Sequence, residues 1–264
     1  LYVKDGVALC VTGMGKVNSA MTLQAILMDD RFDFSNAYII STGCAGSAIE
    51  YGVMGDVFVI TATVDYDLGH HADARELTTD VETTWFHDES YDDASHKILN
   101  QELCDKVYNL VKDVEIETTE KTRAFMAATF ENADWAIRDP KVLRGTTVTG
   151  DNYWKGQHGH ENALLMAETY ACPDPYALTE MEDNAMAVVL DRLGMLDRYI
   201  IIRDSVNTDV FMNGASPESL WDPNFVDSLA SESSVESADI FATAMKNNFT
   251  VGHVVVDAIL NGEL

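Results

Sequence analysis

Short apolar runs separated by polar or small residues predict a buried sheet. Three such runs stand near the start of the chain, at residues 7–11, 38–40 and 55–60. Runs of this kind are typical of strands that are covered on both faces. Between the first two, apolar residues recur at helical spacing and predict a helix over residues 19–29. Strands that alternate with helices indicate an α/β fold.

The later part of the chain continues this alternation. Apolar residues fall on one face of a predicted helix over residues 102–111, and a strand is predicted at residues 144–148. Residues 241–260 predict helices whose strongly apolar part, residues 251–259, would cover the sheet. Because no internal repeat or linker interrupts the pattern, we expect residues 1–264 to form a single domain.

Three segments do not fit the core pattern. Residues 77–98 are polar and predict a loop or insertion, and residues 216–236 are acidic and serine-rich, as is typical of a surface segment. Residues 1–6 read as the middle of a β-hairpin. We therefore expect upstream residues, including an N-terminal strand, to be missing from this sequence.

The stretch 179–209 carries the densest candidate chemistry. It predicts a helix that opens on three acids and closes at Gly194, an apolar strand at residues 199–202, and a polar strand end at residues 203–209. Ligands of open α/β sheets bind outside the carboxyl ends of strands. The polar strand end could instead be a solvated loop with Asx turns.

Glu180 and Glu182 flank Met181 at the start of the predicted helix. Two ionised carboxylates suit a vicinal diol, because each accepts hydroxyl protons in strong, charge-assisted hydrogen bonds. The alternative is that Glu182 and Asp183 only complement the positive end of the helix dipole.

Two small-residue segments follow predicted strands. The segment Gly13-Met14-Gly15-Lys16-Val17-Asn18 fits neither a dinucleotide fingerprint nor a P-loop, so its glycines predict a structural turn. Residues 41–47, with Ser41, Gly43 and Cys44, predict a loop whose backbone amides approach a ligand closely.

Histidines and aromatic residues mark two further loops. Adjacent His70 and His71 face opposite ways on an extended segment, so we expect no metal site there. A ligand-facing loop that includes His71 and Arg75 is the favoured interpretation. Tyr153 and Trp154 follow the strand at residues 144–148, where a core position at the strand end is one interpretation of an aromatic residue.

The composition excludes some classes of binding partner. The formal net charge of -27, from 44 acids against 17 basic residues, would repel nucleic acid and anionic membranes. No apolar stretch approaches the roughly 20 residues of a membrane helix, so we expect a soluble protein without membrane insertion. The 4 cysteines are widely spaced without a CxxC pair, so no zinc site is expected. The compartment, cytoplasmic or exported, stays open.

Two motifs carry a resemblance to a known family. The first motif is EMED at residues 180–183, and the second is IIIRDSVN at residues 200–207. They resemble the ribose-binding and base-binding segments of the nucleoside phosphorylase and nucleosidase superfamily. The fuller pattern EMEDNA with RDSVNTD is most similar to the purine nucleoside permease family. The resemblance implies a mixed central sheet flanked by helices, a purine nucleoside as ligand and self-association into a homo-oligomer. It implies no cofactor, with inorganic phosphate as co-substrate if the activity is phosphorolysis.

The resemblance also implies roles for residues on the sugar side. Glu182, with Met181 and Glu180, would bind the ribose hydroxyls, and His71 or Arg75 would lie near the ribose 5' end. The segment 41–47 would line the nucleophile site. Ser41 stands where hexameric phosphorylases carry an arginine, which favours hydrolysis over phosphorolysis.

On the base side, Tyr153 would stack on the purine and Trp154 would read its edge. Asn207 stands where many nucleosidases carry an aspartate, and a side-chain amide that both donates and accepts favours a 6-oxopurine. Asp204 or Asp209 could instead be the acid, if burial raised its pKa. Besides a cleaving enzyme, a nucleoside-binding protein that contributes to transport and a protein with a defunct site remain alternatives.

Overall fold

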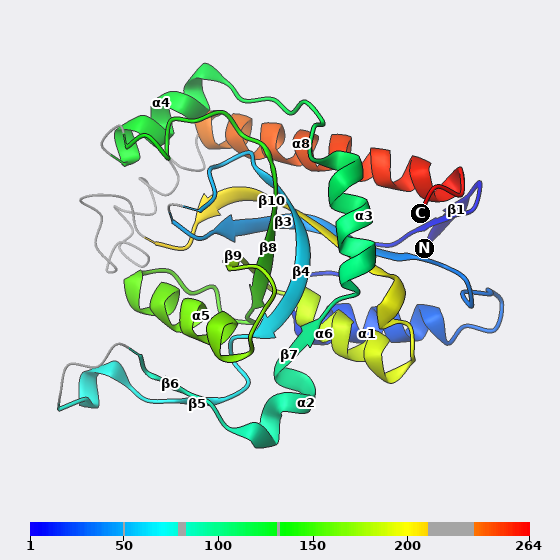
Figure 1. Cartoon of the computed structure of the whole chain (residues 1–264), viewed down its shortest axis with the longest axis horizontal. Coiled ribbons are helices and arrows are strands. Elements are labelled where there is room, and N and C mark those ends of the chain that lie inside the picture. The colour runs from blue at the N-terminus through cyan, green and yellow to red at the C-terminus, as the bar shows by residue number, and fades with distance from the viewer. Residues whose placement is uncertain (50, 79–82, 131–132, 211–234) are drawn as a thin grey trace.

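The computed structural model describes residues 1–49, 51–78, 83–130, 133–210 and 235–264 (Figure 1). Its centre is a sheet of six strands in the order β10-β3-β9-β8-β4-β7. These strands are β3 (Ile39–Ser47), β4 (Val57–Asp65), β7 (His96–Ile98), β8 (Val142–Thr149), β9 (Tyr176–Glu180) and β10 (Tyr199–Thr208). Parallel and antiparallel pairs are mixed, since β10 runs parallel to β3 but β3 runs antiparallel to β9. The start of β4 also pairs with β10, which joins the first and the fifth strands of this order.

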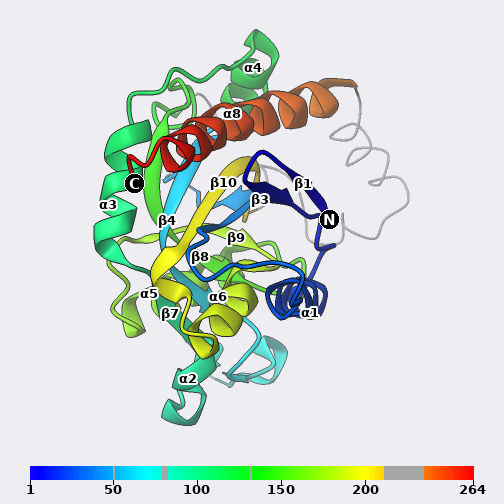
Figure 2. The same ribbon diagram turned by 90° about the vertical axis from the view of Figure 1, so that its right-hand side faces the viewer.

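Helices cover both faces of this sheet (Figure 2). The longer ones are α1 (Lys16–Leu27), α3 (Gln101–Val111), α4 (Glu120–Thr129), α5 (Gln157–Thr169), α6 (Asp183–Arg192) and α8 (Val235–Leu260). A short helix, α2 (Asp92–Ser95), and the 3-10 turns Ala74–Glu76, Glu89–Tyr91 and Leu196–Arg198 occupy the connections. Helix α8 lies on one side of the sheet, and α6 and α1 lie on the other. None of the helices in the described ranges is long and apolar enough to cross a membrane.

Strand β10 shows how the sequence fixes the two faces of the sheet. Tyr199 and Ile201 belong to the core under α6 and α1, whereas Ile200 and Ile202 belong to the core under α3 and α8. Successive side chains of a strand point to opposite faces, and full burial of such a side chain contributes about 1.5–3 kcal/mol. The same alternation continues into the polar end of the strand. Arg203 therefore points toward α6 and donates to its first residue, Asp183.

Most predicted elements are confirmed, and several extend further than predicted. The predicted helix over residues 102–111 is α3, and the predicted strand at residues 144–148 lies within β8. Residues 41–47, predicted as a loop, instead make up most of β3. The predicted polar strand end continues as strand through Thr208. Protein groups bond to buried side chains of this stretch, such as Asp183 to Arg203 and Asn248 to Asp204.

The predicted start of the helix that opens on three acids is wrong, because the first of these acids belongs to a strand. Glu180 is the last residue of β9, a strand that the sequence did not indicate, and α6 begins at Asp183. Residues 77–98 also hold more than a loop, because β6 (Trp85–Phe86) pairs there with β5 (His70–His71). The segment 216–236 lies almost wholly outside the described residues.

The N-terminal segment forms the predicted hairpin, but not a core strand. β1 (Tyr2–Lys4) pairs with β2 (Val7–Leu9) across a turn in which Asp5 and Gly6 have φ of 50° and 82°. Two positive φ angles are the mark of a tight two-residue hairpin turn. Because β2 pairs only with β1 among the described strands, its side chains stay exposed, contrary to the burial predicted for residues 7–11.

Candidate functional site

A cavity of about 1210 Å³ opens at the carboxyl ends of β9 and β10 and along β3. Ten of the predicted site residues line it: Ser41, Gly43, Cys44, Tyr153, Trp154, Glu180, Met181, Glu182, Asn207 and Asp209. Its described lining leaves out Asp204, His71 and Arg75. Segments more than 100 residues apart in the chain thus meet at one site.

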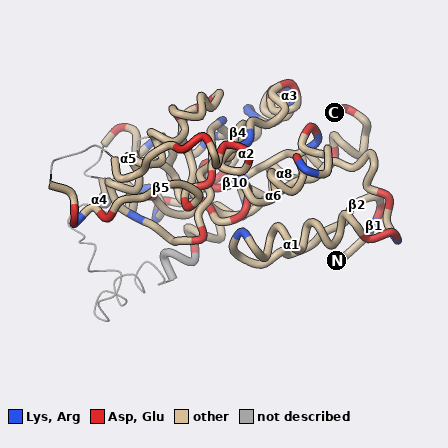
Figure 3. Tube along the Cα trace, turned by 90° about the horizontal axis from the view of Figure 1, so that it is seen from below, with Lys and Arg blue, Asp and Glu red and all other residues tan. Residues whose placement is uncertain are grey.

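The cavity has a polar end and an apolar end. Glu182, Arg203 and Asn207 lie at the polar end. The β1–β2 hairpin, α1, residues 32–40 and α8 contribute mostly uncharged walls. Helix α1 carries no acidic residue although the chain as a whole is strongly acidic (Figure 3). The volume exceeds the roughly 300–1,000 Å³ usual for small-molecule sites.

Arg203 is the centre of the polar end, and sequence reasoning missed it. Its Nε and Nη2 atoms donate to the Asp183 carboxylate at 2.8 and 2.7 Å. Nη2 also lies 3.3 Å from Glu180 Oε2 and 3.2 Å from Glu182 Oε2. Burial alone would lower the pKa of Arg203, but Asp183, Glu180 and Glu182 outweigh it and hold that pKa well above its ordinary range. Arg203 therefore stays charged and joins three carboxylates.

Glu180 supports the turn that leads into α6. Its Oε2 accepts hydrogen bonds from the backbone N–H groups of Glu182 and Asp183 at 2.6 and 2.8 Å. Its Oε1 accepts from the hydroxyls of Thr147 and Thr149. Burial raises the pKa of Glu180 to about 7, with Asp183 adding to the shift and Arg203 opposing it. With five donors on two oxygens, counting Arg203, Glu180 is occupied by the protein itself.

Glu182 is held differently and keeps acceptor capacity toward the cavity. Its Oε1 accepts from the Gly15 backbone N–H at 3.0 Å, and its Oε2 accepts from Arg203 at 3.2 Å. A carboxylate has about four acceptor positions, so both oxygens retain one. Although Glu182 precedes the first residue of α6, its side chain makes no capping hydrogen bond. Glu180 contacts the first N–H groups of the helix instead.

Ser41 and Cys44 offer the site neutral groups. The Ser41 hydroxyl donates to Asp183 Oδ1 at 2.6 Å and is buried. Burial raises the pKa of Cys44, and the neighbouring Asp204 adds to the shift, so Cys44 remains a thiol near neutral pH. Its carbonyl accepts from Arg203 Nη1 at 3.2 Å. Neither side chain is an activated nucleophile.

Asn207, near the carboxyl end of β10, and Tyr153, in the loop after β8, lie together. Asn207 Nδ2 donates to the Tyr153 hydroxyl at 3.3 Å. The Tyr153 ring is 62% exposed, so the buried-core alternative does not describe it. Trp154 does pack into a core cluster, and its ring stacks on Tyr66 with centroids 4.8 Å apart. Tyr153 is thus the ring of the pair that is available to a ligand.

The two aspartates proposed as acids lie in separate environments. Asp209 Oδ2 accepts from the Tyr176 hydroxyl at 2.8 Å and lies 2.7 Å from His160 Nδ1. Asp204 points to the opposite face, where Asn248 Nδ2 of α8 donates to its Oδ1 at 2.6 Å. Burial raises the pKa of Asp204 to about 6. Asp204 is fully buried and does not line the cavity. Its raised pKa suits an acid, but its position does not.

His71 and Arg75 lie away from the cavity. His71 Nε2 is 2.8 Å from the Tyr66 carbonyl oxygen, and exposed Arg75 pairs with Asp73. Within the described ranges, no three His, Cys, Asp or Glu side chains gather closely enough to hold a metal ion. Lys16 of the glycine segment bonds to Asp65 and Asp67, both at 2.9 Å, which agrees with a structural role for that turn.

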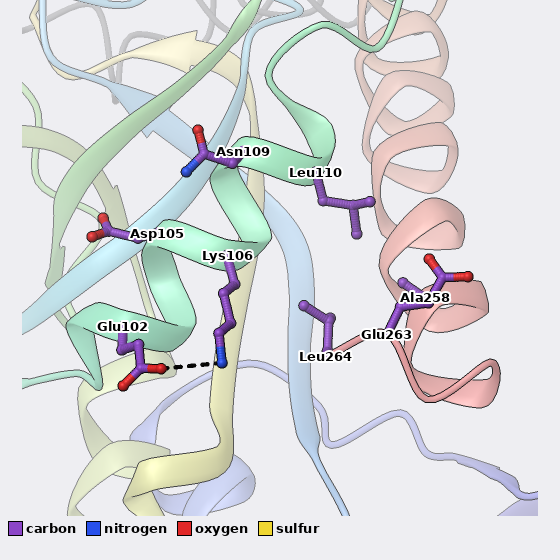
Figure 4. A pocket seen from close by; sticks show the side chains of 8 residues that line it. All are labelled: Glu102, Asp105, Lys106, Asn109, Leu110, Ala258, Glu263 and Leu264. Carbon is purple, nitrogen blue, oxygen red and sulfur yellow. Dashed lines mark ion pairs between the residues drawn. The ribbon is translucent and has the colours of Figure 1, made fainter.

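A second hollow, of about 490 Å³, lies between α3 and the last residues of the chain (Figure 4). Its ion pair joins Lys106 to Glu102 at 3.2 Å, and both side chains are exposed. Exposed pairs of this kind contribute little binding energy. We therefore place the candidate site in the larger cavity.

Comparison with known proteins adds a family and a fold. The family model described as purine nucleoside permease (NUP) matches residues 1–263. A probable purine nucleoside permease of Schizosaccharomyces pombe is 28% identical over 221 residues, which cover 75% of this chain and 63% of that protein. A purine nucleoside permease of Candida albicans is 26% identical over 73% of this chain and 52% of its own length. The chain thus spans about half to two thirds of these two relatives.

Other matches are described as nucleosidases or as a hydrolase. A 5'-methylthioadenosine/S-adenosylhomocysteine nucleosidase of Anoxybacillus flavithermus is 28% identical over 75% of this chain and 66% of its own length. The crystal structure of the corresponding nucleosidase of Neisseria meningitidis, in complex with methylthio-immucillin-A, has a TM-score of 0.55 at 17% identity and covers 94% of this chain and 79% of that one. The futalosine hydrolase of Helicobacter pylori has a TM-score of 0.53 at 14% identity, over 93% and 77% of the two chains. These likenesses confirm the predicted mixed α/β fold.

Proposed function

Because the chain belongs to the purine nucleoside permease family, we propose that it binds purine nucleosides and cleaves their N-glycosidic bond by hydrolysis. One observation carries the proposal. The carboxylate of Glu182 is fixed by Gly15 and Arg203, yet keeps free acceptor positions toward a cavity that Asn207 and Tyr153 also line. The nucleosidase relatives point to the same chemistry.

Glu182 is suited to the sugar. Ribose presents two neighbouring hydroxyls, and a fixed carboxylate accepts both protons in hydrogen bonds worth about 1.5–3 kcal/mol each. Cleavage of a glycosidic bond passes through a cationic, oxocarbenium-like sugar. The carboxylate of Glu182 therefore stabilises the transition state more than the neutral substrate.

Asn207 is suited to the leaving base. As the base departs, N7 takes up a proton, and the amide can then accept from N7–H and donate to O6 of a 6-oxopurine, whereas the 6-amino group of an adenine would meet the amide as a second donor. Tyr153, the exposed ring beside it, offers a stacking surface worth about 1–3 kcal/mol per base. We therefore place inosine and guanosine ahead of adenosine as substrates.

The charge of the polar end favours water over phosphate as nucleophile. Arg203 is the only lysine or arginine among the described cavity-lining residues, and three carboxylates already surround it. A phosphate dianion would need unoccupied cationic donors, because a buried charge without a partner is strongly unfavourable. Water needs only hydrogen-bonding partners. Ser41 is neutral and bonded to Asp183, so it supplies no positive charge.

Nucleoside binding without cleavage is the second candidate. Asn207 can stabilise a departing base but cannot supply a full proton, and relatives of this chain are described as permeases. A protein that binds nucleosides and contributes to their transport would use the same cavity. The two functions differ in whether free base appears.

The deciding experiment measures free base released from inosine, guanosine and adenosine, in phosphate-free buffer and again with phosphate. Glu182→Gln, which keeps the shape of the side chain and removes its charge, is the matched control. Release without phosphate that falls about ten- to hundredfold in Glu182→Gln supports hydrolysis. Release that requires phosphate overturns the argument from Arg203. Nucleoside binding measured by calorimetry, with no release in either buffer, favours the binding protein.

A further inference from the structure

Asp209 and His160 form a buried pair directly behind the predicted base site. Asp209 is 1% exposed and His160 is 7% exposed. His160 Nδ1 lies 2.7 Å from Asp209 Oδ2, and the Tyr176 hydroxyl donates to the same oxygen at 2.8 Å. The other oxygen accepts from the Ile49 backbone N–H at 3.2 Å. Two protein groups thus fill Oδ2 and a third bonds to Oδ1, and at 1% exposure the carboxylate faces its protein neighbours rather than a ligand.

The backbone of Asp209 makes two further connections. Its N–H donates to the Ser47 carbonyl at 3.0 Å, and its carbonyl accepts from the Gly156 N–H at 2.7 Å. Gly156 precedes the first residue of α5 and has φ of 130°, and His160 lies in the next turn of that helix. Asp209 therefore ties the start of α5 to the end of β10 by both its main chain and its side chain. The tie lies two residues beyond Asn207.

The loop between β8 and α5 carries the two predicted base-reading rings. A Cβ atom on Gly159 of α5 would lie 2.4 Å from the Trp154 ring, so Trp154 rests directly on the helix backbone. On its other face Trp154 stacks on Tyr66. The adjacent Tyr153 reaches Asn207 through its hydroxyl. The position of α5 therefore sets where this loop lies relative to Asn207.

We propose that Asp209 and His160 are positioning residues for the nucleobase. They fix the position of α5, and α5 in turn fixes the loop at residues 151–155. The distance between this loop and Asn207 then admits one planar base, with Asn207 at its edge and Tyr153 against its face. The inference rests on the proposed function of the cavity. Its physical basis is the short range of both contacts, since a shift of about 1 Å in a binding group can cost up to a hundredfold.

The test compares two substitutions that each remove one polar partner of Asp209 Oδ2. His160→Leu removes the side-chain tie between Asp209 and α5, whereas Tyr176→Phe removes a hydroxyl of β9 and leaves that tie in place. We expect His160→Leu to weaken inosine binding by about tenfold in calorimetry and to raise KM more than it lowers kcat. Tyr176→Phe should leave both close to wild type. His160→Asn, which keeps a donor near the position of Nδ1, should restore most of the affinity.

Hydrogen exchange of residues 151–156 provides a readout that needs no ligand. Exchange should speed up in His160→Leu but not in Tyr176→Phe. Should His160→Leu fail to fold, Gly159→Ala tests the same link, because its methyl group pushes Trp154 without touching Asp209. We expect the same loss of affinity from it.

The outcomes separate this inference from the proposed function. Equal loss of affinity in His160→Leu and Tyr176→Phe, or unchanged exchange of the loop in His160→Leu, makes the pair merely structural and overturns the inference alone. A wild-type protein that binds no nucleoside and releases no base overturns the proposed function, and with it the assignment of a base to this loop.

Discussion

Replacing Arg203 by methionine tests the charge arrangement of the cavity. Methionine has a similar length but no charge. In the folded protein the guanidinium lies within 3.3 Å of oxygens of Glu180, Glu182 and Asp183. The side chain of Asp183 is 0% exposed and that of Glu180 is 1% exposed. The variant would leave these carboxylates with their remaining hydrogen-bond donors but without a cation.

The expected loss of stability is large. Removal of one partner from a buried ion pair costs about 3–5 kcal/mol, because the other charge stays buried without compensation. In a protein of this size, 1 kcal/mol corresponds to roughly 2–4 °C in melting temperature. We therefore expect Arg203→Met to melt roughly 6–20 °C below the wild type near pH 8.

The loss should shrink in acid. The pKa of Glu180 in the folded protein is about 7, above its ordinary value of 4.5, and Arg203 holds it down from a still higher value. A raised folded-state pKa means that ionisation of Glu180 opposes folding as the pH rises through that pKa, whereas below 4.5 the group is protonated in both states. Without Arg203 the carboxyl of Glu180 takes up a proton more readily. The deficit of the variant should therefore be largest near pH 8 and smaller near pH 5.

Urea unfolding at both pH values measures this difference. Arg75→Met serves as the matched control, because it removes an exposed arginine whose carboxylate partner, Asp73, is also solvent-accessible. The control should be indistinguishable from wild type at either pH. The reasoning fails if Arg203→Met resembles the control, or if its deficit is the same at pH 8 and pH 5.

Three further predictions concern single groups of the site. Glu182→Gln should lower kcat/KM for base release about ten- to hundredfold, the loss of one charge-assisted hydrogen bond, while melting close to wild type; a fully active variant would exclude Glu182 from the chemistry. Gly46→Ala places a methyl group 2.5 Å from Asn207 Oδ1, so calorimetry should show inosine affinity reduced about tenfold, and unchanged affinity would mean that Asn207 does not contact the base. Asp204 has a folded-state pKa of about 6 against an ordinary 3.8, so its ionisation opposes folding as the pH rises through 6. Asp204→Asn should therefore gain up to about 3 kcal/mol over wild type in urea unfolding at pH 8 and lose that advantage near pH 4, whereas a gain that is independent of pH would contradict it.

The periodic parts of the fold could be predicted from the sequence, and the glycine-rich ones could not. Apolar residues at helical spacing were enough to predict α3. The segment 41–47 was misread because glycine and serine are depleted in strands. The structure shows why glycine is needed in this strand: a Cβ on Gly43 would lie 2.8 Å from Arg203 Nη1, and a Cβ on Gly46 would meet Asn207. Side chains of β10 fill the space that larger residues of β3 would need.

The site was predictable as a set of segments, but not as a set of contacts. The EMED motif drew attention to Glu182, which lines the cavity together with most of the other predicted residues. The pairing of Arg203 with Asp183 was not predictable, because it requires knowing that α6 packs on the face of the sheet to which Arg203 of β10 points. The role of Glu180 in supporting α6 likewise depends on β9, a strand of five residues with no distinctive periodicity.

The contacts of the Arg203 cluster also imply an order of folding. The hydrogen bond from Ser41 to Asp183 joins residues 142 apart in the chain, and the one from Gly15 to Glu182 joins residues 167 apart. Long-range contacts form only after the entropy cost of closing large loops has been met, so such contacts are slow to form. The polar end of the cavity should therefore be among the last parts of the molecule to assemble. A nucleoside that binds there recognises only the completed fold, and at a hundredfold excess over its Kd it would stabilise that fold by about 2.7 kcal/mol.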